Sequence, residues 1–197
     1  MSDRGEFAHR YLDGCRAALA ALDTDRIAAA LAELEAAHRA DRTVFLAGNG
    51  GSAATASHIA NDFVWGLSRD GGRGLRAVSL GDCAPLLTAI ANDAAYSEVF
   101  VPGLRTLARA NDVLLVISGS GNSANVLRAL HLAKQIEMRT IGFLGMDGGN
   151  AGPLCDVSVV VPSLDYGFIE DAHLALGHLC TAWLREAARG RVVSPGG

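Results

Sequence analysis

Residues 46–58 read LAGNGGSAATASH and join an apolar run to a glycine-rich turn and an alanine-rich segment. The residues just before the turn, 43–47, are β-branched and apolar, which is typical of a buried parallel strand. The stretch therefore predicts a strand, a tight loop and the start of a helix. Unpaired backbone N–H groups and the positive end of the helix dipole make such a junction an anion site, and we expect the anion to be a phosphate.

The composition limits the class of protein. The chain has 197 residues, half of them hydrophobic, and no low-complexity stretch divides it, so we predict a single domain over residues 1–197. The net charge is −4 and Lys134 is the only lysine, which argues against a nucleic-acid partner. No apolar run reaches the roughly 20 residues of a membrane span, which argues against a membrane partner. The four cysteines are widely spaced and no signal-like block follows the first residues, so we expect a cytoplasmic protein.

Two helical patterns precede five apolar runs that are separated by helical segments. The runs cover residues 43–47, 77–80, 113–117, 140–144 and 157–161. This alternation predicts a three-layer α/β/α fold with a five-stranded parallel sheet in the flavodoxin-like order 2-1-3-4-5. Residues 1–40 form the leading helical pair and 41–190 the α/β core; the pair can pack against a partner subunit or against the sheet. Trp65 and Trp183 lie in helical segments and are expected to be packing residues.

A second turn, SGSGNSAN at residues 118–125, follows the third run and leads into another helical pattern. In the expected strand order it meets the first turn at the switch point where ligands bind. Both turns match the dinucleotide pattern, but the nearest acid, Asp82, comes about thirty positions later rather than about 20, and Lys134 is too distant for a P-loop. Serine hydroxyls instead suit a sugar phosphate, with simple helix capping as the alternative. These serines are Ser52, Ser118, Ser120 and Ser123.

Histidines and acids form two clusters. His58 and Asp62 are four residues apart on the helix after the first turn, so they share a face and can hold one metal ion or relay one proton. The second cluster, EDAH at 170–173 with His178, opens the last helical segment. Glu170 and His178 are about 12 Å apart along an ideal helix axis. Both reach one ion only if Glu170 lies in an irregular first turn or if different subunits contribute, and the residues leave this open.

Four motifs together resemble the sugar isomerase (SIS) domain family: GNGGS at 48–52, AND at 91–93, SGSGNS at 118–123, and the acid and histidine pattern at 170–178. The best match within it is the sedoheptulose 7-phosphate isomerase (phosphoheptose isomerase) branch, and the resemblance covers nearly the whole chain. It implies a homotetramer with active sites between subunits. It also implies that the substrate is bound by Asn49, Gly50, Ser52, Ser118, Gly119, Ser120, Asn122 and Ser123.

The resemblance further implies a metal ion, usually zinc and one per subunit, held by His58, Asp62, Glu170 and His178. Asp62 stands where the family has glutamate, and Glu170 where it has glutamine. Gly119 replaces a usual threonine and Gly66 an arginine.

The implied activity is a metal-dependent aldose–ketose isomerisation that converts sedoheptulose 7-phosphate into a heptose 7-phosphate through an enediol, which requires a base, an acid and a positive group. The resemblance makes Asp62 the base candidate, His178 the acid/base partner and Asp93 a positioning residue. Because metal binding lowers the basicity of a carboxylate, Glu170 is the alternative base. Two other functions stay open: isomerisation of a different sugar phosphate, and a non-catalytic regulator resembling the replication-initiator-associating SIS protein.

Overall fold

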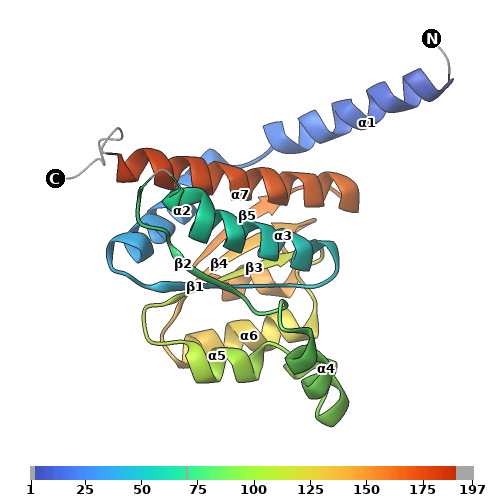
Figure 1. Cartoon of the computed structure of the whole chain (residues 1–197). Helices are drawn as coiled ribbons and strands as arrows, with labels where there is room; N and C mark the ends of the chain where they lie inside the picture. Colours follow the sequence, from blue (N-terminus) through green and yellow to red (C-terminus); the bar gives the residue numbers. More distant parts are fainter. Residues whose placement is uncertain (1–2, 70, 190–197) are drawn as a thin grey trace.

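The sheet has the predicted architecture. The computed structural model describes residues 3–69 and 71–189, and its five parallel strands lie in the order β2-β1-β3-β4-β5 (Figure 1). The strands are β1 Thr43–Gly48, β2 Arg76–Ser79, β3 Val113–Ser118, β4 Arg139–Gly145 and β5 Val157–Val161. The first and last residues of each predicted run lie within one residue of the bounds of the corresponding strand. All six residues of the central strand β3 are buried, as is typical of a parallel strand with the apolar sequence of residues 113–117.

Helices cover both faces of the sheet, so the predicted three layers are confirmed. Helices α2, α3 and α7 lie on one face, and α5 and α6 lie on the other (Figure 1). The helices are α1 Asp3–Ala20, α2 Thr24–Arg39, α3 Gly51–Asn61, α4 Ala84–Asp93, α5 Val101–Leu107, α6 Ala124–Gln135 and α7 Tyr166–Ala188. Shorter turns are the π-helical η1 Asp62–Gly66 and the 3-10 helices η2 Tyr96–Glu98 and η3 Gly149–Leu154. None of the described helices is long and apolar enough to cross a bilayer.

The two leading helices are present but pack differently. Helix α2, which begins where the side chain of Asp23 accepts two backbone N–H bonds, buries Leu34 completely against the sheet. Helix α1 projects away from the body of the molecule (Figure 1). Ala18 is the one buried residue among those described in α1, while Phe7 is 63% and Leu12 60% exposed. The interface role of the helical pair and the division at residue 40 stay predictions, and residues 1–2 and 190–197 of the predicted domain lie outside the described ranges.

The prediction for the two tryptophans is right for one and wrong for the other. Trp183 packs against the core and donates its indole N–H to Glu35 Oε2 at 3.0 Å. Trp65 is 62% exposed. Phe63, fully buried in the same turn, takes the inward position, and a residue two places further on cannot share that face.

Helices α3 and α7 approach each other closely at Gly177. A Cβ atom at Gly177 would lie 2.4 Å from Cγ1 of Ile59, a buried and β-branched side chain of α3. A Cβ at Gly51, at the start of α3, would likewise lie 2.5 Å from the Glu170 carboxylate. Because glycine has no side chain, Gly51 and Gly177 allow the two helices to run side by side from their first turns onward.

We expect Gly177→Ala to lower the free energy of unfolding by about 1–3 kcal/mol, because the added methyl group clashes with Ile59 and overpacks the core. Urea denaturation measures the change. Gly66→Ala is the matched control in the same interface, since its Cβ would lie no closer than 3.6 Å to Asp62 and Thr181. Equal stability of wild type and Gly177→Ala would contradict the close packing.

Candidate active site

Three of the four predicted metal ligands meet where α3, η1 and α7 adjoin. His58 Nε2 lies 3.0 Å from His178 Nε2 and 3.5 Å from Asp62 Oδ2. One ligand atom from each of the three lies within 4.8 Å of the others, the one such group found among the described residues. Tetrahedral zinc with bonds of about 2.0–2.1 Å places neighbouring ligand atoms about 3.3 Å apart, so these nitrogen and oxygen donors fit a zinc-sized ion. Asp62 is the first residue of the π-helical turn, a feature common at functional sites.

Glu170, the fourth predicted ligand, lies elsewhere within the chain. Its carboxylate sits against Gly51, at the first residue of α3 and about 10 Å along that helix from His58. Helix α7 begins at Tyr166 after the N-cap Asp165, so Glu170 belongs to a regular helix. The irregular first turn that would bring it to His178 is not observed. The role of Glu170 as a ligand or base therefore stays a prediction.

The two predicted phosphate loops are adjacent because β1 and β3 pair along their length, with Gly48 opposite Ile117. Helix α3 follows the first loop and has Gly50 as its N-cap; α6 follows the second and has Ser123. Gly50 has no side chain, and the side chain of Ser123 forms no capping hydrogen bond with its helix. Two helix N-termini without side-chain caps thus face the same edge of the sheet, which favours binding of an anion.

The serines of these loops play different parts. Ser52 is 7% exposed in the first turn of α3. Ser118 and Ser120 each accept a backbone N–H from their own loop, from Gly121 at 3.1 Å and Asn122 at 3.2 Å. Both hydroxyl protons remain available for donation, because these bonds use only the oxygen lone pairs.

Two of the residues that differ from the family pattern, Gly119 and Gly66, lie beside side chains of α7. A Cβ at Gly119 would lie 2.7 Å from the ring of Tyr166, so a tyrosine edge fills the space of a larger side chain in the second loop. Gly66 accepts a hydrogen bond on its carbonyl from Arg185 Nη2 at 2.9 Å. A guanidinium from α7 thus lies beside the position where the family has arginine.

Two residues near the loops were not identified from the sequence. Asn125, in α6, exchanges hydrogen bonds with Asn49, and Tyr96, in η2, donates to Asn49. Asn125 was visible only as part of a polar turn, and nothing in a single sequence relates Tyr96 to Asn49. Asp93, at the exposed end of α4, accepts a bond from its neighbour Asn92, and its positioning role stays a prediction.

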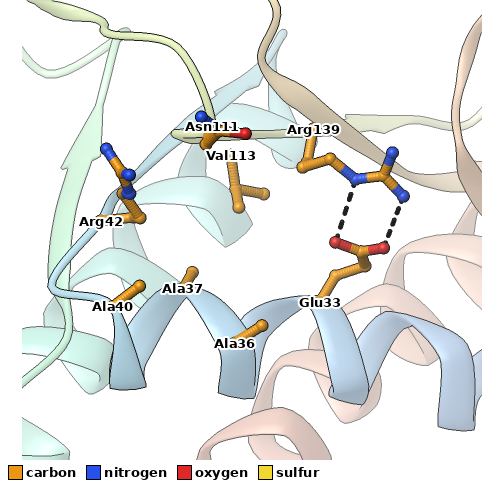
Figure 2. A pocket seen from close by; sticks show the side chains of 8 residues that line it. All are labelled: Glu33, Ala36, Ala37, Ala40, Arg42, Asn111, Val113 and Arg139. Atoms are coloured by element: carbon orange, nitrogen blue, oxygen red, sulfur yellow. Dashed lines mark hydrogen bonds and ion pairs between the residues drawn. The ribbon is translucent and has the colours of Figure 1, made fainter.

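A cavity of about 380 Å³ lies at the opposite edge of the sheet, between the end of α2 and the starts of β3 and β4 (Figure 2). Arg139 forms two hydrogen bonds with Glu33 there, at 3.1 and 2.6 Å, and Arg42 donates to the Ala110 carbonyl. Its cationic groups are therefore already bound to the protein. Ligands of such folds bind at the carboxyl ends of the strands, so this cavity is not the candidate active site.

The fold is a three-layer α/β domain with two glycine-rich loops at the carboxyl edge of its sheet, and the chain belongs to the SIS domain family, whose model matches residues 10–145. It is 45% identical over 148 residues to the phosphoheptose isomerase of Pelobacter propionicus, covering 75% of this chain and 78% of that protein. It is 44% identical over 138 residues to that of Helicobacter pylori strain 26695, covering 69% and 70%.

Among solved structures, the phosphoheptose isomerase GmhA of Neisseria gonorrhoeae superposes with a TM-score of 0.84 at 31% identity, over 92% of this chain and 97% of that one. These likenesses confirm the predicted family and, at the level of enzyme class, the predicted isomerase.

His173 lies on α7 between Glu170 and His178 and is completely buried. Neither of its ring nitrogens has a hydrogen-bond partner among the described residues. Burial lowers the pKa of His173 from 6.5 to about 4, and the nearby backbone of Leu144 opposes this only in part. His173 is therefore a neutral imidazole in the folded protein near neutral pH.

This shift predicts a pH-dependent stability. The unfolded chain binds a proton at His173 below pH 6.5 and the folded chain only below about 4, so stability falls as the pH drops through this window. The total loss from this group is about 3 kcal/mol. Denaturation curves from pH 8 to 4.5 should show His173→Phe gaining stability relative to wild type as the pH falls. The exposed control His131→Phe should not, and parallel profiles for wild type and His173→Phe would rule the effect out.

Proposed function

We propose that the chain is a metal-dependent aldose–ketose isomerase that converts sedoheptulose 7-phosphate into a heptose 7-phosphate through an enediol. The observation that carries the proposal is the convergence of His58, Asp62 and His178 on the same helix pair whose first turn borders the phosphate loops. The similarity to phosphoheptose isomerases supports the choice of substrate. A metal-free regulator has no need of such a donor group, so the site argues against that alternative.

The length of the site accommodates a seven-carbon substrate. Ser52 and His58 are six residues apart on α3, about 9 Å along the helix axis. An extended heptose 7-phosphate spans eight bonds from C1 to phosphorus, roughly 10 Å at about 1.2 Å per bond, the advance along an extended backbone. A phosphate bound by Ser52, Ser118, Ser120 and Ser123 therefore leaves C1 and C2 beside His58 and His178.

The metal proposal rests on the chemistry of the donors. His58, Asp62 and His178 would hold zinc with two imidazole nitrogens and one carboxylate oxygen, which leaves a coordination position for Glu170 or substrate. When bound, the ion supplies Lewis-acid polarisation of the substrate carbonyl. Glu170 of the same chain lies beside Gly51, so its entry into this set requires a neighbouring copy.

Acid–base chemistry is assigned to the chain's own side chains. Ketose-to-aldose conversion removes a proton from C1 and returns one to C2, with a further proton exchanged between the two oxygens. Asp62 is the base if it stays off the metal, and Glu170, a carboxylate outside the cluster, is the base if Asp62 is a ligand. His178 moves the proton between the oxygens, and Asp93 positions the sugar.

The proposal includes a homotetramer with active sites between subunits, located in the cytoplasm. Helix α1 supports the assembly, since Phe7, Leu12 and Leu19 expose apolar side chains that another copy would cover. All four cysteines are free thiols, which suits a reducing compartment.

Incubation of zinc-loaded protein with sedoheptulose 7-phosphate should yield an aldose heptose 7-phosphate, followed by NMR. We expect His58→Ala and His178→Ala to lower the bound zinc and to reduce kcat by about 10²- to 10⁴-fold, because each removes a ligand and His178 also a proton-transfer group. His131→Ala, at an exposed position on α6, is the matched control and should retain both zinc and activity.

Three outcomes would redirect the proposal. Turnover of only another sugar phosphate would favour the alternative substrate, which the Gly119 and Tyr166 contact makes worth testing. Zinc-free protein without turnover that captures a protein partner would favour the regulator. Full activity after metal removal would overturn the metal requirement.

Light scattering should report four chains per particle. Leu12→Asp, which places a charge on the exposed apolar face of α1, should shift the protein to smaller species. Asp13→Asn, at a neighbouring exposed position, should leave the tetramer intact. A monomer in the wild type, or a Leu12→Asp tetramer of unchanged stability, would contradict the role of α1.

A further inference from the structure

Asn49 and Asn125 form a reciprocal amide pair between the two loops. Asn49 Nδ2 donates to Asn125 Oδ1 at 2.9 Å, and Asn125 Nδ2 donates to Asn49 Oδ1 at 2.8 Å. Asn125 is only 2% exposed, whereas Asn49 is half-buried and follows directly on β1. The pair therefore joins a buried support to a side chain at the edge of the site.

One backbone amide determines the orientation of the pair. Val126 N–H donates to Asn125 Oδ1 at 2.9 Å, and a backbone N–H can only donate. The atom of Asn125 that faces both Val126 and Asn49 must accordingly be oxygen, so Asn49 must present its NH₂ group there. The carbonyl oxygen of Asn49 then faces Asn125 Nδ2, and Tyr96 Oη, 2.9 Å from the same oxygen, must be its second donor.

These bonds leave Asn49 with one free hydrogen-bonding function. Its oxygen accepts from Asn125 and from Tyr96, which fills both lone pairs. One of its two amide protons is used by Asn125. The remaining group is a single N–H, so Asn49 is able to donate but has no lone pair left to accept.

We propose that Asn125 and Tyr96 are positioning residues that make Asn49 an obligatory hydrogen-bond donor to an oxygen atom of the sugar phosphate. The inference rests on the proposed function. It adds Asn125 and Tyr96 to that site and specifies that the Asn49 side chain donates, rather than accepts, the hydrogen bond to the substrate. A donor fixed in this way recognises an oxygen that is anionic or carries no competing proton, and its orientation needs no adjustment when the substrate binds. Without its two supports the amide is free to turn and present its oxygen instead.

The first test is a functional double-mutant cycle on Asn49→Ala and Asn125→Ala, read as kcat/KM for sedoheptulose 7-phosphate and, separately, as its dissociation constant by calorimetry. Each single change should lower both affinity and kcat/KM by ~10-fold or more, as expected for one charge-assisted bond. Because Asn125 acts through Asn49, the double variant should be no more than ~2-fold worse than Asn49→Ala. Losses that multiply would overturn the proposal.

Tyr96→Phe tests the second support at an exposed position, where folding is not at risk. It removes one of two donors to Asn49 Oδ1 and should cost ~2- to 10-fold in kcat/KM, again only when Asn49 is present. Asn125→Asp tests polarity, because it keeps the acceptor for Val126 but turns the donor facing Asn49 into an oxygen. It should be at least as harmful as Asn125→Ala, and Asn150→Ala, at an exposed position of η3, should have no effect.

The calorimetric arm separates the two proposals. Binding without turnover in the wild type would refute the isomerase. The double-mutant cycle could then still be evaluated from the dissociation constants alone. Turnover with wild-type kcat/KM and affinity in both Tyr96→Phe and Asn125→Asp would refute the positioning role and leave the isomerase standing.

Discussion

The close packing of α3 against α7 is the constraint on which the site depends. Both helices begin at the carboxyl edge of the sheet and run alongside each other. Gly51 lies beside Glu170, Ile59 packs against Gly177, and His58 lies against His178. A side chain at Gly177 would push the helices apart and with them the two imidazoles. One pair of helices thus carries the proposed anion-binding end and, about two turns further along, the proposed metal cluster, and the distance between them follows from helix geometry alone.

The pairing of β1 with β3 supplies the second half of the site. It brings two glycine turns side by side, and the sheet register leaves little freedom in how they meet. The amide pair of Asn49 and Asn125 then ties the loops together with bonds whose polarity derives from the backbone of α6. Local rigidity at the proposed substrate-binding loops therefore comes from strand pairing and the amide pair, while helix packing determines the arrangement of His58, Asp62 and His178.

The sequence predicted what depends on local pattern and missed what depends on three-dimensional packing. Apolar runs between helical segments identified five strands, and the four-residue spacing identified His58 and Asp62 as neighbours, because both signals follow from local sequence pattern. The packing role predicted for Trp65 was wrong because a π-helical turn follows α3 and places Phe63, rather than Trp65, in the core. No hydrophobic periodicity in the sequence predicts such a turn. Tyr96 lies 47 residues from Asn49, and only the folded chain relates them.

The substitution of an acid for the family's amide at position 170 has a local physical explanation. The carboxylate of Glu170 lies against the first residue of α3, where backbone N–H groups are unpaired and the helix dipole is positive. A negative charge is stabilised there, so the fold tolerates the partly exposed carboxylate of Glu170 at this position. The same helix N-terminus borders the loop proposed to bind phosphate. The Glu170 carboxylate and the substrate phosphate would therefore both lie near the positive end of the α3 dipole. The chain therefore places this carboxylate at its proposed phosphate end, about 10 Å along α3 from His58, so a role of Glu170 as the base would require the active site of a neighbouring copy.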